Sequence, residues 1–148
     1  MYDVITVCHY IAYYCHLKGY ELINLRLQKI LYFLQLLFLD KFGKPCFNNR
    51  MEAWDLGPVV PDAYHHYKKY GAQFIPGERT TDIYEIKEDD RKVIAFVVSA
   101  LSKYSTFQLV DITHEQKPWK DNYVPYDSHE ISVDDMKEFV NESKREAD

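Results

Sequence analysis

The segment from Leu25 to Phe42 constrains the fold of this chain most, because it is apolar on nearly every side of a helix. Its large apolar residues are Leu27, Ile30, Leu31, Phe33, Leu34, Leu37 and Phe38. A helix that is hydrophobic on most faces usually forms the buried centre of a domain. The longest apolar run, residues 30–39, contains Gln35 and is shorter than the span of about twenty residues that a membrane requires. We therefore expect a central core helix.

Further helices are indicated by apolar spacing and by residues that start or end helices. We expect them at about residues 3–18, 58 or 61 to 70, 88–104, 106–115 and from 132 onward. Asp3, Asn24 and Thr106 are candidate N-caps. Gly19 and Gly43 are placed to end the first two helices, since a left-handed residue is common there.

Short strands are expected at Arg50–Trp54 and, as the second arm of a small hairpin, at Ile83–Ile86. The sequence thus predicts a mainly α, compact single domain of about five to six helices, with a small β-hairpin or short strand element. Residues 1–141 form the predicted domain, and the polar residues 142–148 form a tail that frays.

Charge and cysteine content exclude several classes of protein. The chain has 148 residues and a net charge of −5, which fits one domain and opposes a broad nucleic-acid-binding face. Its start lacks the basic residues of a secretory signal, so we expect a cytoplasmic protein with no membrane partner. Cys8 and Cys15 would lie roughly 10 Å apart on one helix, too far to bridge. We expect reduced, buried thiols and no cofactor.

Aromatic residues make up 16% of the chain, an unusually high share. Tyr64, Tyr67 and Tyr70 follow one another at three-residue spacing in a segment that also contains His65-His66. Tyrosine and tryptophan are common anchors of protein interfaces, but they also fill the margins of a core. The sequence leaves open whether this stripe contacts a partner or is half-buried.

The catalytic motifs of common enzymes are missing from the sequence. His114-Glu115 resembles the start of a zinc-protease motif, but the second histidine should fall at position 118, which is Pro118. No glycine-rich phosphate loop or serine nucleophile elbow is present. We therefore predict no catalytic residue and no metal ligand, and keep a small enzyme using His114 and Glu115 as an alternative.

Three segments together resemble the Panacea-domain family of SocA-like and GepA-like phage-associated antitoxins. They are Leu27-Gln28-Lys29-Ile30-Leu31-Tyr32-Phe33, Glu52-Ala53-Trp54-Asp55-Leu56-Gly57-Pro58-Val59-Val60-Pro61 with Tyr64, and Leu109-Val110-Asp111-Ile112-Thr113-His114-Glu115 with Pro118-Trp119. Their order and spacing agree with the family from about Val4 to Val140. The second and third segments are the more specific ones.

The resemblance implies an antitoxin of a toxin–antitoxin system that neutralises a co-encoded toxin by direct binding. Delivery of the toxin to a protease, as a proteolytic adaptor, is the first alternative. The second alternative is a prophage-encoded regulator that contacts DNA, or the small enzyme named above. The sequence leaves open whether the protein forms a homodimer. The sequence does not identify the toxin.

Two interpretations of the motif residues remain open at this point. In one, Trp54, Trp119, His114 and the Gly-Pro turn lock the irregular middle onto the helices. In the other, these residues line a groove that holds a segment of the partner, together with a polar stripe of the central helix formed by Gln28, Tyr32 and Gln35. The candidate partner-binding residues are Gln28, Tyr32, Gln35, Trp54, Tyr64, Tyr67, His114 and Trp119.

Overall fold

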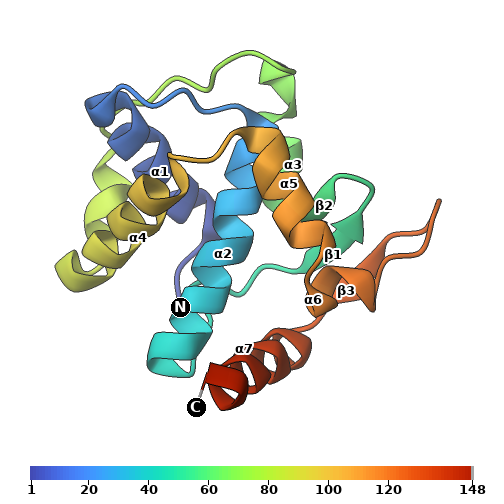
Figure 1. Ribbon diagram of the computed structural model, residues 1–148. Helices are drawn as coiled ribbons and strands as arrows, with labels where there is room; N and C mark the ends of the chain where they lie inside the picture. Colours follow the sequence, from blue (N-terminus) through green and yellow to red (C-terminus); the bar gives the residue numbers. More distant parts are fainter. Residues whose placement is uncertain (148) are drawn as a thin grey trace.

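A computed structural model describes residues 1–147 and shows a mainly α domain with a small sheet (Figure 1). Seven α-helices are described: α1 (Val4–Lys18), α2 (Asn24–Phe42), α3 (Pro61–Tyr67), α4 (Glu88–Leu101), α5 (Thr106–His114), α6 (Lys117–Lys120) and α7 (Val133–Ala147). Two 3₁₀ helices, η1 (Lys68–Tyr70) and η2 (Thr81–Glu85), flank a long connecting segment. The strands are β1 (Met51–Trp54), β2 (Gly57–Val59) and β3 (His129–Ile131). The predicted fold class is confirmed.

Helix α2 lies at the centre of the domain, as its apolar composition predicts. It packs against α3, α4, α5, α7 and β2 (Figure 1). Its side chains at Leu27, Ile30, Leu31 and Leu34 are almost fully buried. The helix missing from the prediction is α6, which has only four residues and begins with Lys117-Pro118. A single turn is too short to show helical periodicity in a sequence.

The sheet has the order β2-β1-β3, and both pairings are antiparallel. The predicted extended segment at residues 50–54 is confirmed as β1, whereas β2 and β3 were not predicted, and Pro58, a candidate helix start, lies in β2. The predicted strand Ile83–Ile86 is wrong, because this segment lies in and after η2. Ile83 and Ile86 are both buried, and a 3₁₀ turn places residues three apart on one side. The strand propensity of isoleucine was therefore misleading.

The predicted helix ends are confirmed at Gly19 and Gly43, which adopt left-handed φ angles of 74° and 69°. The predicted starts were less accurate. Asn24 is the first residue of α2 rather than its cap, and its side chain donates to the Tyr64 carbonyl oxygen at 3.1 Å. Ser105, not Thr106, caps α5 through a capping box with Gln108.

Helix α7 continues to Ala147, through most of the polar stretch predicted to be a tail. The ammonium of Lys144 connects the C-terminal end of α7 to the end of α2. It lies 2.9 Å from the Asp40 carboxylate and donates to the Asp40 carbonyl oxygen at 3.0 Å. Asp148 lies outside the described residues.

None of the described helices is by itself long and apolar enough to cross a membrane. Only α4 and α5 taken together reach that composition, and they are bent by 99° at their junction. The three cysteines are free and buried, as predicted. Burial raises the pKa of the Cys15 thiol to about 11.

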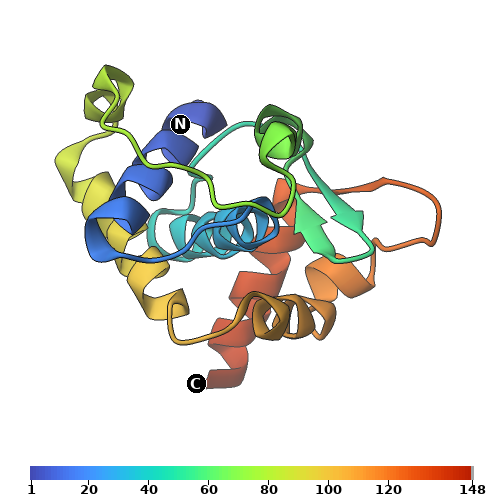
Figure 2. The same ribbon diagram turned by 90° about the horizontal axis from the view of Figure 1, so that it is seen from above.

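The segment 71–87, which contains η2, crosses α1 as a strap and leads into α4 (Figure 2). A Cβ atom on Gly77 would lie 2.2 Å from the Ala12 carbonyl oxygen, so only glycine permits this close crossing. The Ile75 backbone amide donates to the Leu22 carbonyl oxygen at 2.7 Å. Further along, Asp82 fastens the strap to α1.

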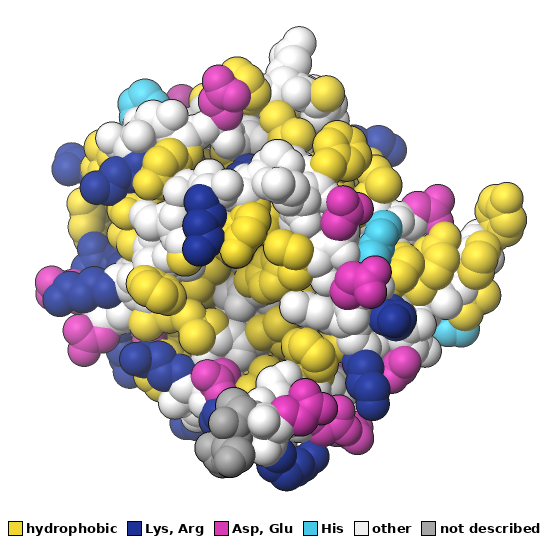
Figure 3. Space-filling model, viewed as in Figure 1, with side chains coloured by type: hydrophobic (Ala, Val, Ile, Leu, Met, Phe, Trp, Pro, Cys, Tyr) yellow, Lys and Arg dark blue, Asp and Glu magenta, His cyan; other side chains and the backbone are white. Residues whose placement is uncertain are grey.

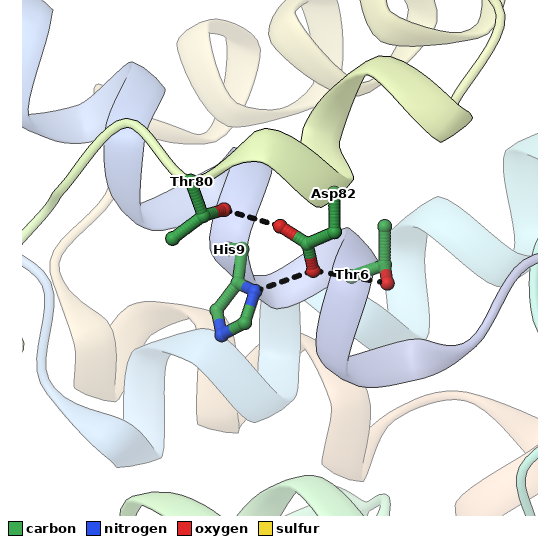
Figure 4. Close-up of polar contacts among 4 residues, drawn as sticks. All are labelled: Thr6, His9, Thr80 and Asp82. Atoms are coloured by element: carbon green, nitrogen blue, oxygen red, sulfur yellow. Dashed lines mark hydrogen bonds and ion pairs between the residues drawn. The ribbon is translucent and has the colours of Figure 1, made fainter.

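Asp82 accepts hydrogen bonds from both α1 and its own segment (Figure 4). Its carboxylate lies 2.7 Å from His9 Nδ1 and 3.2 Å from the Thr6 hydroxyl, and it also accepts from Thr80. Burial opposes the charge of Asp82, but the hydrogen bonds from Thr80 and His9 outweigh it and lower the pKa of the carboxyl. The stabilisation is therefore present at neutral pH and is lost as pH falls through that lowered pKa.

Replacement of Asp82 with alanine is expected to loosen the strap. We expect the free energy of unfolding to fall by about 1 kcal/mol, because the lost contacts are partly exposed. Limited proteolysis should cut residues 71–87 faster than in the parent protein. Asp89→Ala, in the exposed first turn of α4, is the control. Equal cleavage rates in the two variants would show that Asp82 does not hold the strap.

Candidate partner-binding groove

One broad groove of about 850 Å³ opens between the first turn of α2, the β1–β2 turn, α3 with η1, the start of α5 and the loop 121–128. We call it the groove. Its lining residues are mainly apolar or aromatic: Ile23, Asn24, Leu25, Gln28, Trp54, Asp55, Leu56, Val59, Tyr64, Lys68, Gly71, Ala72, Phe107, Tyr123, Tyr126, Asp127 and Ser128. A groove of this size and character is typical of a ligand or peptide site.

Several large apolar side chains of the groove are exposed to solvent. Leu56 is 47% exposed, Phe107 is 64% exposed and Tyr126 is fully exposed. Tyr126 lies in the loop 121–128, which projects from the domain and carries apolar side chains (Figure 3). Its φ of 65° is unusual for a residue other than glycine, and such strained positions are often found at functional sites.

Trp54 and Tyr64 form one aromatic wall, and the sequence named both as candidates. Their ring centroids are 4.9 Å apart in an edge-to-face arrangement that favours attraction between aromatic rings. Trp54 comes from β1 and Tyr64 from α3. The antiparallel hairpin and the helix that follows it therefore bring the two side chains together in one wall of the groove.

Three stacked rings support the β1–β2 turn from behind. The centroid of Trp119 lies 4.1 Å from that of His114 and 4.5 Å from that of Tyr123. Trp119 Nε1 donates to the Trp54 carbonyl oxygen at 2.7 Å, and His114 Nε2 lies 3.0 Å from the Asp55 carbonyl oxygen. His114 and Trp119 thus hold the turn and do not line the groove, whereas Tyr123, which the sequence did not single out, does.

The polar stripe of α2 is buried and bonded inside the protein. Gln28 accepts from the Val60 amide at 2.9 Å and lies in the floor of the groove. Gln35 accepts from the Cys46 amide at 2.8 Å, and Tyr32 donates to the Gln116 side chain at 2.7 Å. Tyr32 and Gln35 do not reach the groove. They are buried, and their hydrogen bonds satisfy polar groups of the irregular segments around α2.

Tyr67, the remaining candidate, is the last residue of α3. Its side chain is buried and does not line the groove. Among the described residues, no group forms a hydrogen bond with its hydroxyl. Burial raises the pKa of this hydroxyl above its usual value. Tyr67 therefore contributes to packing in this structure.

The most unusual buried group is Lys29, which the sequence marks only as part of the family motif. Its side chain is fully buried, and Nζ donates to the Pro58 carbonyl oxygen at 2.7 Å. Burial lowers the pKa of Lys29 to about 7. Gly57 adopts a φ of 107° directly against it, so the β1–β2 turn is fixed to α2 from inside. A lysine within an apolar run was the signal that could have identified this contact.

A small helical scaffold with an aromatic groove, whose walls are held by internal hydrogen bonds, has an architecture typical of recognition domains. The chain belongs to the SocA-like Panacea-domain family: the sequence profile described as "Antitoxin SocA-like, Panacea domain" matches residues 27–120. The matched region runs from α2 to α6 and includes the β1–β2 hairpin and His114–Trp119. The resemblance inferred from the sequence is confirmed.

Antitoxin SocA of Caulobacter vibrioides (strain NA1000 / CB15N) is 32% identical over 107 residues. The alignment covers 65% of this chain and 57% of that relative, so the chain spans little more than half the length of the relative. No solved structure matches this chain significantly.

Proposed function

We propose that this protein is the antitoxin of a toxin–antitoxin pair and neutralises a co-encoded toxin by binding it directly in the groove. Family membership supports an antitoxin role. The observation that carries the binding mode is the exposed aromatic lining, above all Phe107 and Tyr126. Binding energy in protein interfaces is concentrated in a few such anchors, which become buried in the complex.

A role in binding rather than catalysis fits the positions of the polar residues. His114, the residue kept for an enzymatic alternative, stacks on Trp119 and contacts the backbone of Asp55. Its structural contacts suffice to explain its place in the motif. A His114→Ala variant that stays folded and still neutralises the toxin would remove the enzymatic alternative.

The proposal is tested by co-expression with the neighbouring gene product, scoring growth and co-purification together. We expect the neighbour alone to stop growth, and this protein to restore growth in a stable complex. Restored growth with loss of the neighbour's protein would instead support delivery to a protease. A harmless neighbour that does not co-purify would remove the main support for the antitoxin assignment.

Phe107→Ala is expected to weaken toxin binding at least about tenfold, as for an interface anchor. Its side chain is 64% exposed and lines the groove, so the free energy of unfolding should change little. Phe96→Ala is a matched control, because Phe96 is also an exposed helical phenylalanine, at 66%, but lies on α4 outside the groove. Kd from titration calorimetry and growth rescue are the two measurements.

Equal loss of binding in the Phe107 and Phe96 variants would contradict a site in the groove. Loss only in the Phe96 variant would move the partner surface to α4. Thermal unfolding of both variants shows whether any loss of binding reflects loss of folding.

A further inference from the structure

We propose that the groove takes a linear segment of the partner in which apolar side chains lie between a basic and an acidic residue. This inference rests on the proposed function and specifies the chemistry of the occupant. It follows from three features of the groove: an apolar floor, two carboxylates on the β1–β2 turn and the loop 121–128, and a lysine on η1.

The apolar part of the groove selects large apolar side chains. Leu25 and Val59 lie in its floor region, and Trp54, Tyr64 and Phe107 contribute aromatic surface. A concave aromatic groove accepts an extended or helical segment, whereas a flat patch accepts a folded surface. Tyr126, fully exposed in the projecting loop, adds further aromatic surface.

The carboxylates of Asp55 and Asp127 lie on the wall formed by the β1–β2 turn and the loop 121–128. Asp55 accepts a hydrogen bond from the Tyr123 hydroxyl, and Asp127 lies 2.9 Å from His129 Nε2. Among the described residues, no lysine or arginine forms an ion pair with either carboxylate. This wall is therefore complementary to a basic residue of the partner.

Lys68 lines the groove from η1. No carboxylate in residues 1–147 pairs with it. The first turn of α2 opens beside this lining, and its cap residue Ile23 has no side-chain acceptor for the free amides. Both features add positive potential, which favours an acidic group of the partner. Acidic groups on the turn and loop and a basic group on η1 thus favour a segment that carries charged residues of both signs.

The test uses the purified full chain and a phage-displayed library of random linear peptides. The parent protein should enrich peptides with large apolar residues between a lysine or arginine and an aspartate or glutamate. With the Asp127→Lys variant, selection should replace the basic residue by an acidic one. The best parent peptide should bind Asp127→Lys and Lys68→Glu about twofold to tenfold more weakly, as expected when an exposed ion pair becomes a repulsion.

Asp111→Lys is the matched control, because it changes the net charge as Asp127→Lys does but lies on α5 outside the groove. The control should select the same peptides as the parent protein. The inference is overturned if no peptide depends on Phe107, or if Asp127→Lys and Asp111→Lys select the same flanking charges.

This experiment needs no toxin, so its failure is distinguishable from failure of the proposed function. Growth rescue without peptide enrichment would mean that the toxin binds as a folded surface. Peptide enrichment without growth rescue would leave the groove as a peptide site and remove the antitoxin role.

Discussion

Gly57→Ala should lower the free energy of unfolding by about 2–5 kcal/mol, the sum of backbone strain and overpacking. A Cβ atom at this position would lie 2.7 Å from Thr113 Oγ1, 2.9 Å from Lys29 Cε and 3.0 Å from Lys29 Nζ. The backbone φ of 107° is also one that residues with a side chain rarely adopt. Urea denaturation measures the change as a lower transition midpoint.

Gly43→Ala is the control for the effect of a positive φ alone. Gly43 has a φ of 69°, but a Cβ atom there would meet nothing within 4 Å. We expect this variant to cost only about 1–2 kcal/mol. If the Gly57 and Gly43 variants lose equal stability, the close approach of Gly57 to Lys29 and Thr113 has no energetic consequence.

Lys29→Met should change the pH dependence of stability strongly between about pH 7 and 10. Burial lowers the pKa of Lys29 from 10.5 to about 7 in the folded protein. Between these values the unfolded chain binds a proton that the folded protein does not. The Lys29 contribution to the free energy of unfolding therefore rises with pH, by about 1.4 kcal/mol per pH unit between about pH 7 and 10.

The difference between the parent protein and Lys29→Met isolates this contribution. Buried cysteines and tyrosines titrate in both proteins, so their effects cancel. The loss of the donor to the Pro58 carbonyl oxygen adds a cost that does not depend on pH. We expect the parent protein to gain several kcal/mol relative to the variant between about pH 6 and 10.

Urea denaturation across this pH range provides the measurement. Lys92→Met is the control, since the Lys92 side chain is 71% exposed and only pairs with Glu88 at 3.8 Å. Parallel stability curves for the parent protein and Lys29→Met would contradict a buried Lys29 with a lowered pKa.

The elements that could be predicted from sequence are those fixed by local signals. The apolar composition of α2 and the glycines after α1 and α2 each act over a few residues, and each was placed correctly. The wrong strand at residues 83–86 and the unpredicted β3 depend on contacts with distant segments. β3, for example, exists because His129–Ile131 pair with Met51–Ala53.

The site shows the same division between local and long-range information. Trp54 and Tyr64 line the groove because the motif places them on a hairpin and the helix that follows it. The sequence presents the stripe of α2 as one polar face, but the Gln35 side chain accepts hydrogen bonds from the backbone amides of Cys46 and Phe47. Which backbone groups a buried glutamine will satisfy depends on where an irregular segment runs. No periodicity in the sequence encodes that path.

The wall of the groove at residues 121–128 has a consequence for how relatives could diverge. The family profile spans residues 27–120, so it covers the parts of the groove formed by the β1–β2 hairpin, α3 and α5 but not this loop. The loop connects α6 to β3. The Asn122 side chain holds its start by donating hydrogen bonds to the Pro118 carbonyl oxygen and the Asp135 carboxylate. Surface loops tolerate insertions and substitutions better than helices that form a core. If the groove binds the partner as proposed, exchange of this single loop would change the partner while the fold that carries it stays unchanged.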